Sequence, residues 1–231
     1  MKMRSGEYHE RGDYHKELDK NWPYYPVYLT KMAFVESFLD RFGKDKKILD
    51  AGCGEGLLVE QFCERGFDVS GIDMHYESEY VLRGNICATD YESGSFDMIM
   101  CLDVLEHLSY EDQEKAINEF HRILAPNGVL LITVPNLAHF ASRVSFLLTG
   151  RLLRTSDARR HIGDRPITEY IDMITPQFQI DKRKGFFPTF PIISALTLLI
   201  PGRIVWMHRL YNAICAYPNW CFLNVIIARK K

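Results

Sequence analysis

The chain has 231 residues, of which 47% are hydrophobic and 25% are charged. These values are ordinary for a globular protein, exclude a low-complexity chain, and suit a single domain over residues 1–231. The first residues stay polar to about Lys20, so we expect no export signal. None of the six cysteines has Cys-x-x-Cys spacing, which favours reduced thiols and a cytoplasmic protein.

The net charge of −2 conceals two parts of opposite sign. Residues 1–142 hold 14 Lys and Arg against 25 Asp and Glu, a net of −11, whereas residues 143–231 hold 14 against 5, a net of +9. Either the two parts neutralise each other in the fold, or the basic part meets an anionic partner. The acidic first part disfavours a phosphate backbone, so we expect no nucleic-acid partner.

The first part of the chain alternates between strand and helix patterns. Apolar residues recur at helical spacing from Val27 to Phe42, and Gly43 ends that helix. We expect strands at 47–51, 67–73, 80–85, 96–102 and 129–134, with helices at 27–42, 57–65 and 111–124. Such alternation implies right-handed crossovers and a mainly parallel sheet.

After Pro135 the alternation breaks down. We expect a helical segment at 137–148, an arginine-rich loop at 151–165, a helix at 168–174, strands at 178–185 and 220–229, and an apolar insertion at 186–217. The whole pattern predicts an α/β fold: a Rossmann-like, mainly parallel seven-stranded sheet flanked by helices, with C-terminal insertions.

A glycine-rich turn joins the first strand to the next helix. It contains Gly52, Gly54 and Gly56. Glycines let the backbone approach a ligand closely, and the free N–H groups of a helix start bind carboxylate or phosphate. The dinucleotide fingerprint Gly-x-Gly-x-x-Gly would require glycine at position 57, where this chain has Leu57. A nicotinamide-dependent dehydrogenase is therefore disfavoured.

Asp73 ends the second strand, 23 residues after Asp50. A carboxylate at this position can accept hydrogen bonds from both hydroxyls of a nucleoside ribose. The alternative is an ordinary aspartate that starts a turn. The glycine-rich turn at this distance favours ribose binding.

Four segments, two of which contain the glycine-rich turn and Asp73, match the sequence pattern of a known family. They are residues 48–56, 71–73, 94–108 and 124–130. Together they resemble the class I S-adenosylmethionine-dependent methyltransferases over about residues 26–135, and weakly at the last strand. Within that family they are most similar to small-molecule enzymes of ubiquinone biosynthesis and of cell-surface sugar and lipid pathways. The resemblance implies a cofactor-binding core at 26–135, substrate-side insertions at 136–217 and a final strand at 218–231.

The resemblance also implies S-adenosylmethionine as the cofactor and places residues around it. Gly52 would lie against the methionine part, Asp73 would hold the ribose, and Leu102 would line the pocket. Asn85 and Ile86 would flank the adenine, although many relatives have Asp where this chain has Asn85. The remaining expected members of the cofactor site are Asp50, Gly54, Gly56 and Met74.

Asp103, Glu106 and His107 are the catalytic candidates. If a helix starts here, their i, i+3, i+4 spacing puts them on one face. A neutral imidazole can remove a hydroxyl proton as the methyl group moves. Some ubiquinone-pathway relatives hold a divalent ion with an acid-x-x-Glu-His set that these residues resemble, and a purely structural turn is the third interpretation. Because alignment supplies much of the acceleration in methyl transfer, no base is obligatory.

The expected reaction is methylation of oxygen on a small or lipid-linked acceptor. Amino-directed relatives typically carry an Asn/Asp-Pro-Pro-aromatic motif after strand four, where this chain has Cys101, Leu102, Asp103 and Val104. The alternative from another class is a partner subunit that binds the cofactor without turnover.

The C-terminal insertions are where we expect acceptor selection. Basic side chains crowd the first insertion, opposed by two acids: Arg143, Arg151, Arg154, Arg159, Arg160, His161 and Arg165 against Asp157 and Asp164. Guanidinium groups suit phosphate and carboxylate. The apolar run 186–201 is too short to span a bilayer and predicts a core helix, a lid over the acceptor or an interfacial anchor. The sharpest expectation is an anionic acceptor at or near a membrane surface.

Overall fold

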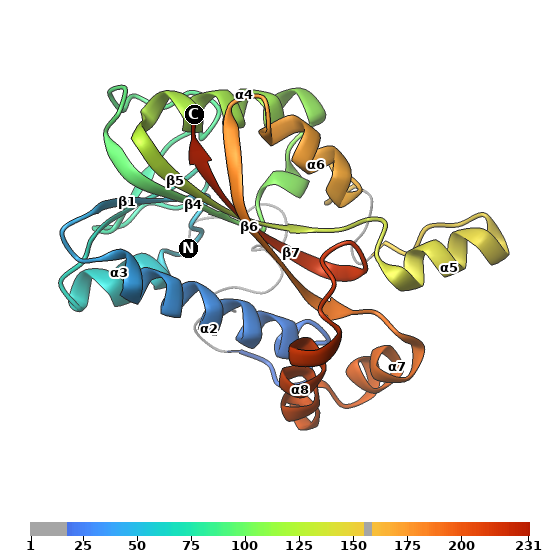
Figure 1. The fold of residues 1–231 in the computed structure, drawn as a ribbon. Coiled ribbons are helices and arrows are strands. Elements are labelled where there is room, and N and C mark those ends of the chain that lie inside the picture. Colours follow the sequence, from blue (N-terminus) through green and yellow to red (C-terminus); the bar gives the residue numbers. More distant parts are fainter. Residues whose placement is uncertain (1–17, 155–158) are drawn as a thin grey trace.

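The computed structural model describes residues 18–154 and 159–231 (Figure 1). The polar N-terminal residues up to 17, and Asp157 of the arginine-rich loop, lie outside the described residues. Within these ranges seven strands form one sheet in the order β3-β2-β1-β4-β5-β7-β6. Their bounds are Lys47–Ala51 (β1), Asp68–Asp73 (β2), Val81–Arg83 (β3), Phe96–Leu102 (β4), Leu124–Pro135 (β5), Phe178–Pro188 (β6) and Cys221–Lys230 (β7).

The pairing of the strands is mainly parallel. The first five strands pair in parallel, whereas β7 is antiparallel to both β5 and β6. The centres of β1 and β4 are buried on both faces, which matches their almost unbroken apolar sequences. The predicted Rossmann-like, mainly parallel seven-stranded sheet is confirmed.

Helices cover both faces of the sheet. Their bounds are Tyr25–Phe42 (α2), Leu57–Glu64 (α3), Tyr110–Ile123 (α4), Phe140–Thr149 (α5), Ile167–Ile174 (α6), Pro191–Leu199 (α7) and Val205–Cys215 (α8). Helices α4 and α6 pack on one face, and α2 and α3 on the other (Figure 1). Each face of the sheet therefore has its own apolar core.

The local predictions need three corrections. The segment 103–107 is not an α-helix: it forms only a single 3-10 turn, Leu105–His107, because Asp103 has a left-handed backbone with φ 56°. The helix expected from 137 begins at Phe140, after His139 accepts a hydrogen bond from the Ser142 amide. The insertion 186–217 splits into the end of β6, α7, a 3-10 turn and α8.

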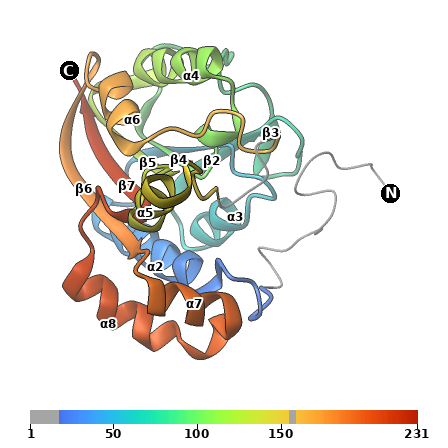
Figure 2. The ribbon, with the colours of Figure 1, turned by 90° about the vertical axis from the view of Figure 1, so that its right-hand side faces the viewer.

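Three helices lie apart from the two main layers. Helix α5 follows β5 and projects beyond the carboxyl end of that strand, and α7 and α8 lie below it in Figure 2. Aromatic contacts join the three helices. The Phe140 and Phe190 ring centroids are 4.6 Å apart, and those of Phe190 and Tyr211 are 5.9 Å apart. Among the described residues, no helix has both the length and the apolar content to cross a bilayer.

Candidate active site

The glycine-rich turn lies tightly against the segment that follows β4. Gly52, Gly54 and Gly56 all have positive φ, between 57° and 81°. A Cβ atom on Gly52 would lie 2.5 Å from Cγ2 of Val104. Because the left-handed backbone and this close approach both require glycine, the sequence at position 52 is explained physically. The turn and the Asp103–His107 segment are therefore direct neighbours.

Asp73 connects β2 to the glycine-rich turn. Its carboxylate accepts hydrogen bonds from the Gly54 amide (2.9 Å) and the His75 amide (2.8 Å), and only 6% of the residue is exposed. An ionised carboxylate has about four lone-pair directions, so two remain for other donors. Asp73 orders the turn and keeps acceptor capacity for a ligand.

Asp50 is buried in β1 next to the turn. Burial raises the pKa of its carboxyl group to about 7; the Lys31 ammonium opposes this and Asp73 adds to it. Because 4% of Asp50 is exposed, the charged form lacks water to solvate it. Its protonation state therefore changes near neutral pH.

The other expected cofactor residues lie at the same edge of the sheet. The carboxyl ends of β1, β2, β3 and β4 are aligned by their parallel pairing. Ile86 is buried in the core, whereas Met74 and Asn85 are exposed, and Leu102 is half-buried at the end of β4. The Asn85 side-chain oxygen accepts a hydrogen bond from the Cys87 amide, which fixes the orientation of that amide group.

Asp103 belongs to a half-buried polar network that reaches α2. It accepts hydrogen bonds from the Tyr24 hydroxyl (2.8 Å), the Lys31 ammonium (2.8 Å) and the Thr133 hydroxyl. Burial alone would raise the pKa of Asp103, but the Lys31 charge and these hydrogen bonds lower it below its usual value. The Lys31 ammonium also lies 5.0 Å from the centre of the Tyr28 ring.

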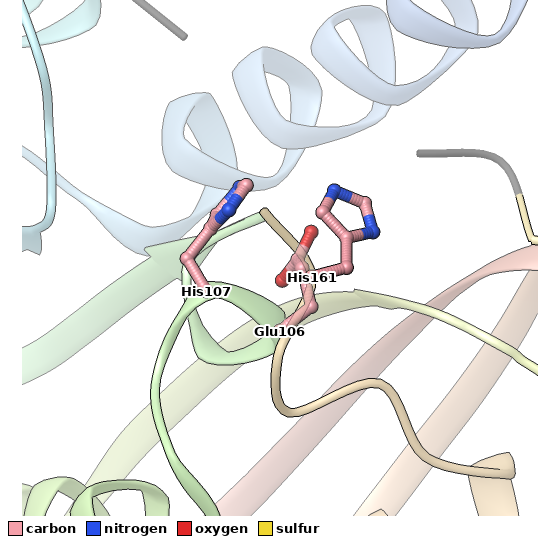
Figure 3. Close-up of side chains that lie close together, drawn as sticks. All are labelled: Glu106, His107 and His161. Atoms are coloured by element: carbon pink, nitrogen blue, oxygen red, sulfur yellow. The ribbon is translucent and has the colours of Figure 1, made fainter. Parts of the chain in front are cut away.

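Glu106 and His107 lie next to His161 rather than beside the Asp103 network. Each of the three offers a ligand atom, and these atoms all lie within 4.8 Å of one another (Figure 3). The rings of His107 and His161 meet edge to face, with centroids 4.8 Å apart. His161 approaches Asp164 at 3.2 Å between Nδ1 and Oδ1. The predicted trio is thus only partly assembled, and His161 joins its last two members.

The protonation states within this cluster follow from its contacts. Burial raises the pKa of Glu106 well above its usual value, and Asp103 raises it further. The Glu106 Oε2 atom is buried and has no hydrogen-bond partner among the described residues. His107 Nδ1 lies 3.1 Å from the Arg160 carbonyl oxygen. Because a carbonyl only accepts, Nδ1 carries the hydrogen, and a neutral His107 then has its lone pair on Nε2.

Buried hydrogen bonds hold the arginine-rich loop over this segment. The Gln113 amide group donates to the carbonyls of Leu105 and Gly163, both at 2.8 Å. The Arg165 guanidinium donates to the Gln113 side-chain oxygen, and Arg154 pairs with Asp164. These contacts fix the position of His161.

Two members of the site were missed from sequence. Lys31 lies at four-residue spacing from the buried Val27 and Val35, so that spacing already indicates its burial. His161 gives no such signal, because its neighbour His107 lies far away along the chain. Only the tertiary fold brings these two histidines together.

Solved structures share this fold at low sequence identity. An S-adenosylmethionine-dependent methyltransferase from Archaeoglobus fulgidus matches with a TM-score of 0.56 at 20% identity, covering 90% of this chain and 100% of that one. One from Methanosarcina mazei matches with a TM-score of 0.54 at 17% identity, covering 81% and 93%. The strand order of this chain and these two matches show that it has the fold of these S-adenosylmethionine-dependent methyltransferases.

The family follows from sequence comparison. Residues 25–169 match the family model described as a methyltransferase domain, and the chain belongs to that family. The ubiquinone biosynthesis O-methyltransferase of Idiomarina loihiensis is 31% identical over 130 residues, covering 49% of this chain and 52% of that protein. The protein of the same name from Pseudomonas aeruginosa UCBPP-PA14 is 31% identical over 138 residues, covering 53% and 59%. The chain spans about half the length of these curated relatives.

Proposed function

We propose that this chain transfers a methyl group from S-adenosylmethionine to a hydroxyl oxygen of a small or lipid-linked acceptor. The observation that carries the proposal is the position of His107. It follows three residues after Val104, which lies against Gly52 of the glycine-rich turn, and its Nδ1 atom bonds to the Arg160 carbonyl. The name of the curated relatives specifies O-methylation for those proteins, which supports oxygen as the methylated atom.

His107 is proposed as the general base. The bound cofactor supplies a methyl group on a positively charged sulfur, which leaves as a neutral thioether. As the acceptor oxygen forms its bond to the methyl carbon, its proton passes to Nε2 of His107. The Glu106 carboxyl group is adjacent, and its ionised form would stabilise the positive charge that His107 gains with this proton.

Asp103 is proposed to position the segment rather than to exchange protons. Its pKa is lowered and it accepts three hydrogen bonds, so it is a weak base. Its bond to Thr133 joins the end of β4 to β5, and its bond to Lys31 joins both to α2. This network holds Glu106 and His107 at the carboxyl edge of the sheet.

The cofactor is proposed to bind along the carboxyl ends of β1 to β4. Gly52, Gly54 and Gly56 let it approach the backbone, and the remaining lone pairs of Asp73 accept the ribose hydroxyls. The other members of the proposed cofactor site are Asp50, Met74, Asn85, Ile86 and Leu102.

A divalent ion is the second candidate role for the cluster. Glu106, His107 and His161 offer one carboxylate and two imidazoles, a donor set that suits transition-metal ions better than magnesium. Asp103 is engaged by Lys31 and is not a member of this group. An ion held there would polarise the acceptor hydroxyl.

We propose that the acceptor is anionic. We also propose that this protein is cytoplasmic and binds the acceptor while peripheral to the membrane. The basic loop 159–165 lies over the catalytic segment, where Gln113 bonds to both. The net charge of +9 over residues 143–231 supports a negatively charged acceptor on this side.

The test is transfer of an isotopically labelled methyl group to phenols, lipid-linked phenols and sugar phosphates. His107→Ala is expected to slow turnover about 10²–10⁴-fold with little change in cofactor affinity. His121→Ala, in the last turn of α4, is the matched control and is expected to keep full activity. A chelator separates the two roles, because only an ion-dependent enzyme loses activity and regains it with added metal.

Cofactor binding without transfer to any acceptor would favour the non-catalytic subunit instead. Equal turnover of the His107→Ala and unmodified proteins, with no effect of the chelator, would return the cluster to a structural role.

A further inference from the structure

We infer that α5, α7 and α8 form a docking surface for an anionic lipid bilayer. The inference builds on the proposed function, because docking would bring the acceptor site to the membrane. Vesicle binding is measured without cofactor or acceptor, however, so the two proposals can fail separately.

The three helices expose large apolar side chains and bury polar ones. In α8 the buried residues are the polar His208 and Asn212, whereas Trp206, Leu210 and Ile214 are 65%, 58% and 67% exposed. These three recur every four residues and so share one side of the helix. A surface helix of a water-soluble protein normally shows the reverse arrangement.

The other two helices also expose large apolar side chains. The buried residues of α7 are Ile193 and the polar Thr197, while Ile192 and Leu199 are 80% and 77% exposed. The only buried residue of α5 is Ser142, while Leu147 is 83% exposed. We define the apolar surface as the exposed large hydrophobic residues of segments 144–153 and 192–220: Val144, Phe146, Leu147, Leu148, Leu152, Leu153, Ile192, Leu198, Leu199, Ile200, Trp206, Leu210, Ile214, Tyr217 and Trp220.

Internal hydrogen bonds fix this inverted orientation. The Thr197 hydroxyl lies 2.8 Å from Nε2 of His208, and the Asn212 side-chain oxygen accepts from the Phe187 amide at 2.7 Å. Turning α8 over would bury its leucine and tryptophan but expose or orphan these polar groups. The exposed apolar side is therefore a built feature of the fold.

The charge around the apolar surface identifies its occupant. No acidic residue occurs from 120 to 156 or from 182 to 231. The segments 143–154 and 192–220 carry five exposed arginines: Arg143, Arg151, Arg154, Arg203 and Arg209. Arginines on the same segments as exposed leucines, tryptophans and a tyrosine match the interface of an anionic bilayer.

A second copy of the chain fits this surface poorly. A symmetric dimer places the same patch on both sides, so the arginines of one copy would meet those of the other with no acid to pair with. An anionic bilayer offers both negative headgroups and an apolar interior. The charge and the apolar content together favour lipid.

The location of the surface gives docking a purpose. Helix α5 follows β5, and the Thr133 hydroxyl near the end of β5 donates a hydrogen bond to the Asp103 carboxylate. The helix therefore projects from the edge of the sheet that carries the proposed active site (Figure 1). A lipid-linked acceptor could reach that site without leaving the bilayer.

The experiment is flotation of the full chain with phosphatidylcholine vesicles, with and without phosphatidylglycerol. We expect binding to the anionic vesicles only, weakened by salt. Leu147→Ser with Leu148→Ser, or Leu198→Ser with Leu199→Ser, should lower the affinity roughly tenfold or more. Each of Arg203→Gln and Arg209→Gln should lower it about fivefold.

Matched controls change the same residue types elsewhere. Leu82→Ser on β3 and Arg41→Gln in the last turn of α2 should leave vesicle binding unchanged. Thermal unfolding verifies that every variant is folded. The inference is overturned if the folded chain binds no vesicle at low salt, if it binds neutral vesicles equally well, or if light scattering shows a dimer that the leucine substitutions dissociate.

Discussion

Helices α4 and α8 bury opposite kinds of residue. In α4 the buried side includes Ile117 and Phe120, and its acidic first turn faces water. In α8 the buried side consists of His208 and Asn212, while Trp206 is exposed. Apolar burial holds the first helix in place and hydrogen bonds hold the second. The contrast is that the proposed cofactor half (residues 26–135) turns polar side chains to water, whereas the apolar surface turns apolar ones outward, as the inferred bilayer contact requires.

The largest expected stability effect lies in the cofactor half. Lys31→Met removes a buried ammonium group and leaves the Asp103 carboxylate, which is only 21% exposed, without its ion-pair partner, so we expect the free energy of unfolding to fall by about 3–5 kcal/mol. Arg65→Met is the control, because its pair with Asp40 is exposed and contributes at most about 1 kcal/mol. Chemical denaturation measures both. Equal effects of the two substitutions would show that the half-buried network is not held by charge.

The second prediction concerns pH and Asp50. Its folded pKa, about 7, is raised above the unfolded value, so the stability that this group contributes is fully present below the unfolded pKa. That stability is lost as the pH rises toward and through about 7. The shift corresponds to about 4 kcal/mol. Asp50→Asn should flatten the fall in unfolding free energy between acidic and neutral pH; a variant with the same pH profile as the unmodified protein would contradict the assignment.

The sequence predicted the sheet and the glycine-rich turn well because both depend on local patterns. Unbroken apolar runs identify β1 and β4, and positive φ requires the glycines that the turn contains. The cluster of Glu106, His107 and His161 was harder to predict from the sequence. Its geometry depends on the left-handed Asp103 and on His161, which only the folded loop brings to His107.

The orientation of α8 could not be predicted from the sequence, for a different reason. Periodicity reveals that a helix has two unlike sides, but it does not reveal which side faces the protein. The default places the apolar side inward. Here the bonds of Thr197 to His208 and of Asn212 to the Phe187 amide decide the orientation, and both are tertiary contacts.

A third prediction tests the cofactor half at Asp73. Loss of a charge-assisted hydrogen bond of about 1.5–3 kcal/mol should weaken binding of S-adenosylmethionine about tenfold or more in Asp73→Ala. Asp73→Asn keeps one acceptor oxygen for the turn but removes the charge, so it separates ligand binding from the bonds to Gly54 and His75. Calorimetry measures the affinity. A folded variant with unchanged affinity would exclude a role in ribose binding.

The smallest expected effect is that of an exposed leucine in α8, and it tests the comparison between α4 and α8 directly. Leu210→Ala on the exposed side of α8 should change the free energy of unfolding by less than about 0.5 kcal/mol, because this leucine is 58% exposed. The matched Ile117→Ala in α4 should lower it by about 2–5 kcal/mol, since that side chain is buried. Thr197→Val in α7 should lower it by about 1–3 kcal/mol, because it leaves buried Nε2 of His208 without a partner. In the cofactor half an apolar side chain then matters most, and in the α7–α8 region a hydroxyl matters more than a leucine. A large loss for Leu210→Ala together with a neutral Thr197→Val would mean that α8 packs by its apolar side after all, and no apolar surface would remain for a bilayer.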